Sequence, residues 1–231
     1  EDEEGQFTIA TTHTHARYVL PSVIGKFIQK YPKVELSLRQ GNPAQCCQLV
    51  ATGQADLAIC TDPGDLAEVA QVPCYWLHRS AITPRRHPLL RIKPLTLEAL
   101  SRYPLITYDE AFRGRKIVDK TFSDRGLHPR IVLSAVDADV SKVYVGMGLG
   151  IAIFASVVFD PKQDVNLRRI DARHLFEPSS LNLMVRRYSY LRTYMADFIQ
   201  MFAPRIDKEL IDKTLFKRRT AKMARMTLPE L

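Results

Sequence analysis

The chain has 231 residues, of which 46% are hydrophobic, so it can bury one large core or two small ones. Its formal net charge is +8, and no apolar run approaches the roughly 20 residues that a membrane span needs. The acidic start, Glu1 to Glu4, is also unlike the basic entry of a signal peptide. We therefore exclude membrane-spanning classes and expect a cytoplasmic protein.

The cysteines do not indicate a metal site or a disulfide framework. The four stand at positions 46, 47, 60 and 74, without a C-x-x-C spacing and without paired histidines. Cys46 and Cys47 lie inside a helical pattern and are interpreted as core residues rather than as a redox pair. We expect reduced thiols, and neither a metal nor another cofactor.

The positive charge is concentrated near the carboxyl end, in a basic tail at residues 207–231. From Lys208 to Leu231, three acidic residues accompany seven basic ones: Lys208, Lys213, Lys217, Arg218, Arg219, Lys222 and Arg225. The rest of the chain is mildly basic and has no stripe of basic residues interleaved with aromatic ones. We therefore do not expect these residues to bind DNA by themselves, and the tail is interpreted as a solvated terminal helix.

The first half alternates strand and helix signals, as in a sheet covered by helices. The predicted elements are a strand at 7–11, a helix at 16–31, a strand at 34–38, a helix at 43–52 and a strand at 56–60. Pro21 must either kink the long helix or mark the first residue of its regular part. Such a run leaves strand carboxyl ends and helix amino ends on one edge, where ligands collect.

The second half repeats this alternation after an extended, proline-rich stretch at 73–88. We predict a strand at 105–107, a helix at 116–125, a strand at 131–134, a helix at 138–147 and a strand at 149–154. The run Leu181 to Arg187 is interpreted as a return to the first half, before a helix at 191–202. The predicted domains are one α/β lobe of residues 1–78 and 182–206, and a second of residues 79–181, with a cleft between them.

A sequence motif adds a family resemblance. The run Thr11 to Tyr18 reads T-T-H-T-H-A-R-Y and resembles T-T-H-T-Q-A-R-Y, which begins the effector domain in the cysteine-regulon (CysB-like) branch of LysR-type transcription regulators. The other matching stretches are 40–43, 53–59, 73–75, 103–108, 137–140, 148–150, 198–200 and 202–204. The resemblance covers residues 7–205; the first motif is specific to the branch, whereas Gly148-Leu149-Gly150 is shared by LysR effector domains generally.

The resemblance implies an α/β fold like that of the type 2 periplasmic binding proteins, with two lobes and the effector in the interlobe cleft. It implies a sensing domain for sulfur assimilation or cysteine biosynthesis, whose effector is a small anion such as sulfate or an acetylated serine. It also implies a homodimer or homotetramer, and DNA binding through an amino-terminal winged helix-turn-helix that we expect to lie outside these residues.

The same resemblance implies that five residues line the effector site: Thr12, Thr14, His15, Thr61 and Arg113. The first three fall where the first strand ends and the long helix begins. A helix amino terminus carries unpaired N–H groups and a partial positive charge of roughly +0.5, which favours an anion.

Two of these positions depart from the family. His15 replaces a glutamine, and Arg113 replaces the threonine of an F-T-G-R stretch. Each change introduces a residue that is or can be cationic, which predicts a more anionic ligand. We expect Arg113 to lie in a loop at 108–114 of the second lobe and to face the turn at 12–15.

Simpler roles stay open for all five residues: a helix cap for Thr12 and Thr14, an exposed first-turn position for His15, a turn position for Thr61 and an ion pair of Arg113 with Asp109 or Glu110.

Other functional classes fit less well. A solute-binding protein of the same fold is the main alternative, and it would carry a signal peptide or a lipid-attachment cysteine. The six histidines are scattered, no G-x-S-x-G sequence occurs, and no serine, histidine and acid cluster can be nominated by spacing. We therefore do not expect an enzyme.

Overall fold

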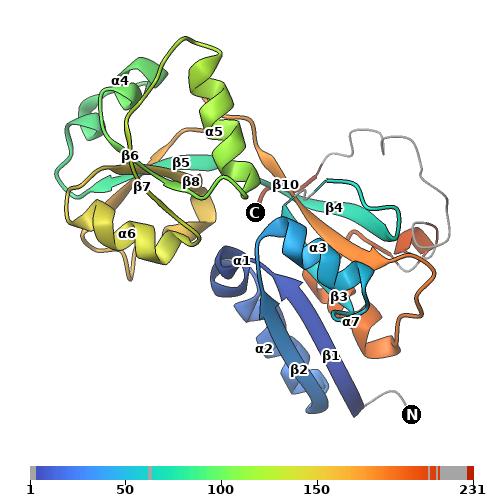
Figure 1. Ribbon diagram of the computed structural model, residues 1–231. Coiled ribbons are helices and arrows are strands. Elements are labelled where there is room, and N and C mark those ends of the chain that lie inside the picture. Colours follow the sequence, from blue (N-terminus) through green and yellow to red (C-terminus); the bar gives the residue numbers. More distant parts are fainter. Residues whose placement is uncertain (1–3, 62–63, 208, 212, 214–227) are drawn as a thin grey trace. The chain divides into compact units, whose positions relative to one another are not determined.

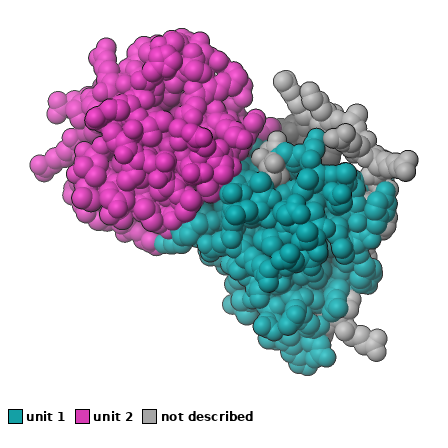
Figure 2. Space-filling model, in the orientation of Figure 1, with its two compact units in different colours: residues 1–75, 180–229 teal, residues 76–179, 230–231 magenta. Residues whose placement is uncertain are grey.

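The chain passes three times between two compact units in the computed structural model, which describes residues 4–61, 64–207, 209–211, 213 and 228–231 (Figure 1). Unit 1 comprises residues 1–75 and 180–229, and unit 2 comprises residues 76–179 and 230–231 (Figure 2). The passages fall at 75/76, 179/180 and 229/230. Most of the basic tail, Lys208 and residues 214–227, lies outside the described residues.

Unit 1 is built on a five-stranded mixed sheet of order β2-β1-β3-β10-β4. Its strands are β1 (Glu4–Thr11), β2 (Lys33–Gln40), β3 (Leu57–Thr61), β4 (Val69–Leu77) and β10 (Ser179–Arg186). β1 runs parallel to both β2 and β3, whereas β10 runs antiparallel to β3. Because β2, β1 and β3 are parallel, Gln40, Thr11 and Thr61 end at the same edge of the sheet.

The helices of unit 1 are α1 (His13–Tyr18), α2 (Pro21–Lys30), α3 (Pro43–Ala51) and α7 (Thr193–Phe202). The prediction of one helix over 16–31 is wrong, because α1 ends at Tyr18 and α2 begins at Pro21. Proline has no N–H with which to continue the hydrogen-bonded ladder of α1, but it suits the first position of a new helix. The second of the two alternatives for Pro21 is therefore correct.

Aromatic residues join α2 and α7 to the same face of β1. Phe7, Phe27 and Phe198 are fully buried, and their ring centroids lie 5.3 to 5.5 Å apart. Close ring packing of this kind adds to the stabilisation from the buried apolar area. Another buried cluster joins α3 to the sheet and contains Cys46 and Cys47. All four cysteines are buried.

Unit 2 has a separate five-stranded mixed sheet of order β7-β6-β8-β5-β9. Its strands are β5 (Arg79–Pro84), β6 (Leu105–Tyr108), β7 (Ile131–Ala135), β8 (Ile151–Ala155) and β9 (Leu167–Asp171). β9 was not predicted. It is an edge strand in which only Leu167 is buried, so its sequence carries little apolar signal.

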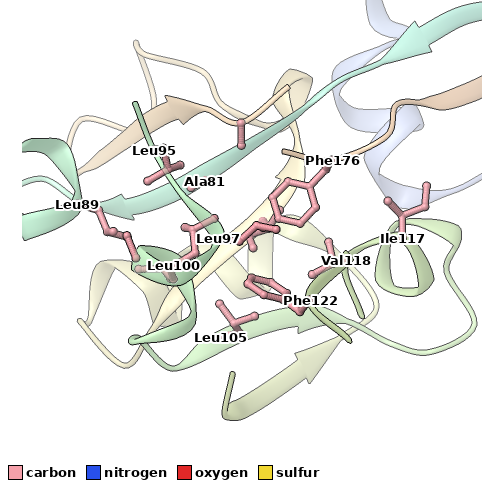
Figure 3. Packing of buried hydrophobic residues seen from close by; sticks show 14 residues of the cluster. Ala81, Leu89, Leu95, Leu97, Leu100, Leu105, Ile117, Val118, Phe122 and Phe176 are labelled. Atoms are coloured by element: carbon pink, nitrogen blue, oxygen red, sulfur yellow. The ribbon is translucent and has the colours of Figure 1, made fainter. Parts of the chain in front are cut away.

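The helices of unit 2 are α4 (Leu97–Ser101), α5 (Arg113–Ser123) and α6 (Ala138–Gly146), with 3-10 turns at Pro88–Arg91 and Ser156–Val158. Residues from α4, α5 and the sheet share one buried cluster, in which Phe122 lies beside Phe176 (Figure 3). This cluster fixes α5 against β6, β8 and β5, and so determines where the first turn of α5 lies.

The Gly-Leu-Gly stretch before β8 has a packing explanation. Gly148 has a φ of +79°, and a Cβ at Gly150 would lie 2.7 Å from the backbone oxygen of Pro104. Glycine suits both positions, because it accepts a positive φ without strain and lets backbones approach closely. The motif therefore closes α6 and seats β8 beside β6.

Candidate functional site

Polar side chains gather at the carboxyl edge of β1 and β3 in unit 1. Thr11 ends β1 and is fully buried, and its Oγ1 donates to the carbonyl of Ile59, 2.7 Å away on β3. Thr12 and Thr14 follow directly and are 4% and 7% exposed. Thr61, the last residue of β3, is half-buried. Because β1 and β3 are parallel, Thr61 lies at the same edge of the sheet as Thr11 and the two threonines that follow it.

Thr12 caps α1. Its backbone is extended, with φ −83° and ψ 161°, and its Oγ1 accepts from the backbone N–H of His15 at 3.4 Å. The same oxygen lies 3.0 Å from Nδ1 of His15. Both contacts stay inside the turn, so the capping role considered for Thr12 is present.

His15 is buried rather than exposed. Only 4% of the residue is exposed, so the exposed first-turn position considered for it is wrong. Burial lowers the pKa of His15 to about 4, and the backbone carbonyl of Ile59 opposes this shift only in part. The ring is therefore neutral near pH 7, and the expectation that His15 brings positive charge is wrong for the folded chain.

The helix after the first strand is shorter than predicted. Because α1 has only six residues, the dipole of a long helix does not act at this turn. Polarity at this edge therefore comes from hydroxyl groups and local backbone groups. Thr14, in the first turn of α1, and Thr61 are the two predicted threonines that do not cap the helix.

Arg113 belongs to unit 2 and is the first residue of α5, so its predicted place in a loop is wrong. The helix starts three residues before the predicted position 116, with Phe112 as an extended N-cap. Arg113 is exposed and contributes to a hollow of about 360 Å³. The other residues around this hollow are Leu97, Lys116, Ile117, Lys120, Thr121, Asp124, Arg125, His174, Leu175 and Glu177.

The ion pair considered for Arg113 is not found among the residues that the structure describes. The Asp109 carboxylate accepts from the backbone N–H of Ala111 at 3.0 Å. Glu110 instead lies 3.8 Å from the guanidinium of Arg115, which also pairs with Asp119 at 2.7 Å. The acidic neighbours in sequence thus neutralise the arginine at 115 and leave the one at 113 available.

Arg79 is a residue that sequence reasoning missed. It begins β5, is only 4% exposed, and donates to the Glu177 carbonyl and the Ser179 hydroxyl. Burial lowers the pKa of Arg79 to about 10; Tyr108 opposes the shift and the like charge of Arg113 adds to it. Arg79 is still cationic near pH 7, so unit 2 carries two arginines near the start of α5. An arginine that opens a strand with no other charged residue was the available signal.

No group of three histidine, cysteine or acidic side chains suited to a metal occurs in the described part of the chain. The helices of that part include none long and apolar enough to cross a membrane.

Comparisons with known proteins agree with the motif. The model of a family described as "LysR substrate binding domain" matches residues 1–207. The regulator CysB of Burkholderia cenocepacia is 45% identical over 214 residues, which cover 92% of this chain and 68% of that protein. The regulator SsuR of the same organism is 43% identical over 209 residues, which cover 90% of this chain and 68% of that protein. The regulator cbl of Escherichia coli is 41% identical over 201 residues, which cover 87% of this chain and 64% of that protein. The chain thus spans about two thirds of these relatives.

Solved structures give the same answer for the fold. The cofactor-binding domain of the Cbl transcriptional regulator has a TM-score of 0.89 at 38% identity and covers 94% of this chain and 96% of its own. The effector-binding domain of QuiR in complex with shikimate has a TM-score of 0.76 at 16% identity, covering 93% of this chain and 100% of its own, which bears on the fold alone. The predicted two-lobed α/β class is confirmed, and the relatives are named as regulators rather than as enzymes.

Proposed function

Because this chain belongs to the family of LysR substrate-binding domains, we propose that it senses a small anionic sulfur metabolite for a transcription regulator of sulfur assimilation or cysteine biosynthesis. The kinship with CysB, SsuR and Cbl regulators supports the pathway. DNA contact then belongs to an amino-terminal domain beyond the residues considered, and the effector acts by its different affinity for two arrangements of the protein.

The observation that carries the proposal is the threonine-rich edge of unit 1. Thr14 and Thr61 supply hydroxyl donors, while Thr12 and His15 hold the turn through their mutual contact of 3.0 Å. Since His15 is neutral near pH 7, the charge that attracts the anion comes from the arginines of unit 2. Arg113, which has no acidic partner among the described residues, is the one we assign to the effector.

Calorimetric titration with sulfate and with an acetylated serine tests the unit 1 edge. We expect Thr14→Ala and Thr61→Ala each to weaken binding of a charged effector by about tenfold, because one charge-assisted hydrogen bond is lost. Thr52→Ala is the matched control; the Thr52 hydroxyl also lies in unit 1, but it donates to the backbone carbonyls of Gln48 at 2.9 Å and Leu49 at 3.4 Å. Unchanged affinity in both site variants would place the effector elsewhere.

The regulator is also proposed to work as a homodimer or homotetramer, and unit 2 has a surface suited to a second copy. Val136, Val143 and Met147 are 61 to 64% exposed, and Val140, on the same helix as Val143, is 45% exposed. These residues lie beside β7, an edge strand of the sheet. A grouped apolar surface of this kind is typical of a protein interface.

We expect the double substitution Val143→Glu, Met147→Glu to shift the chain toward monomer at micromolar concentration, because it places charges in the contact. Sedimentation velocity measures the change. Tyr190, exposed by 81% in unit 1, provides the control as Tyr190→Glu. Identical sedimentation of all three proteins would rule out this surface as the interface.

A further inference from the structure

Glu230 and Leu231, the last residues of the chain, contact Trp76, the residue at which the chain first enters unit 2. The backbone N–H of Leu231 donates to the carbonyl of Trp76 at 3.1 Å, and Glu230 forms a parallel bridge with Trp76. Trp76 lies near the end of β4, directly after the point at which the chain leaves unit 1. A segment from the carboxyl end thus lies beside the connection between the units.

The side chain of Glu230 adds two polar contacts. Its carboxylate oxygens lie 3.2 Å from Nε2 of His78 and 3.2 Å from Nη1 of Arg173. Nδ1 of His78 is buried and has no hydrogen-bond partner in the described part of the chain, so Glu230 is the polar anchor of that ring. Arg173 is itself held by Asp171 at 2.9 Å, which presents its guanidinium to Glu230.

These contacts join segments that are distant in sequence. Residues 76–79, which include the last two residues of β4 and the first of β5, form the connection that carries the chain into unit 2. Arg79, at the end of this connection, also bonds Glu177 and Ser179 next to the second passage. The carboxyl-terminal segment therefore docks on the connection through which the chain enters unit 2.

We propose that residues 228–231 form a strap that docks on the connection at 76–79, with Glu230 as its anchor, and that release of the strap weakens effector binding. The second half of this statement rests on the proposed function. Docking restricts the connection before the effector arrives, so less conformational entropy is lost on binding. Release restores that freedom and lowers the affinity.

The solvent exposure of the anchoring ion pair sets how large an effect we expect from its removal. The side chains of Glu230 and Arg173 are 56% and 51% exposed, so solvent screens their attraction. Removal of the anchor charge should change the ratio of docked to released strap by about two- to fivefold. The loss of effector affinity can therefore be no larger than this two- to fivefold change in the ratio of docked to released strap.

Trp76 reports the docking directly, because it is the only tryptophan of the chain. We expect Glu230→Gln to increase acrylamide quenching of its fluorescence, and Leu231→Pro, which removes the N–H that bonds Trp76, to increase it further. Arg173→Gln should act like Glu230→Gln, and the double variant should add little. Glu209→Gln removes the same charge from a pair with Lys213 and is the control.

Titrations of the same variants with sulfate and with an acetylated serine test whether release of the strap weakens effector binding. Two- to fivefold weaker binding in Glu230→Gln and Leu231→Pro, with Glu209→Gln like wild type, supports the strap. Quenching that is unchanged in both strap variants overturns it, and changed quenching with unchanged affinity overturns its effect on the effector. If wild type binds neither ligand, the proposed function fails, while the Trp76 measurement still decides whether the strap docks.

Discussion

Between pH 6.5 and 4, the wild-type chain should lose about 3 kcal/mol of stability that the variant His15→Gln keeps. Burial lowers the pKa of His15 from 6.5 to about 4 in the folded chain, whereas in the unfolded chain the imidazole titrates near its ordinary value. In this window the unfolded state binds the extra proton and the folded state does not, so stability falls as the pH falls. Above pH 6.5 both states are neutral, and the effect disappears.

Urea unfolding at several pH values measures this difference. Glutamine can still bond the Thr12 hydroxyl but cannot take up a proton, so subtraction of the two stability curves removes the contribution of all other groups. His128→Gln, the same change at an exposed histidine, is the control and should track wild type more closely. Parallel curves for wild type and His15→Gln would mean that His15 does not stay neutral inside the fold.

Arg113→Thr should weaken binding of a doubly charged effector by about 10- to 150-fold. The arginine is exposed at the start of α5, and the nearby acids Asp109 and Glu110 are engaged by Ala111 and Arg115. Its planar guanidinium can grip two oxygens of a sulfate or sulfonate at once, and a threonine hydroxyl cannot. A zwitterionic acetylated serine should lose less affinity than sulfate.

Titration calorimetry of both proteins with both ligands decides this prediction. The variant Arg102→Thr removes one positive charge from another exposed position of unit 2, and so controls for the long-range electrostatic effect of losing a charge. If Arg113→Thr and Arg102→Thr change sulfate affinity equally, Arg113 acts only through long-range charge. Equal affinities of wild type and Arg113→Thr for both ligands would remove Arg113 from the site.

The sequence by itself determined the class of fold, the family and most of the strands. Period-two and period-3.6 apolar patterns report which face of an element is buried, and this information is local. The run Thr11 to Tyr18 also fixed the family, because it is long and specific to one branch. The strand β9 was missed because only its first residue is buried, and the helix α4 was missed because its five residues are too few to show a helical period.

The tertiary structure alone decided what the residues of the candidate site can do. The charge state of His15 depends on burial near Ile59, which is distant in sequence. Which arginine of α5 is neutralised depended on the direction of the side chains at 113 and 115. The buried cation at Arg79 and the return of Glu230 to Trp76 likewise arise from long-range neighbours. Desolvation and ion pairing act between groups that only the folded chain brings together, and a local pattern carries no record of them.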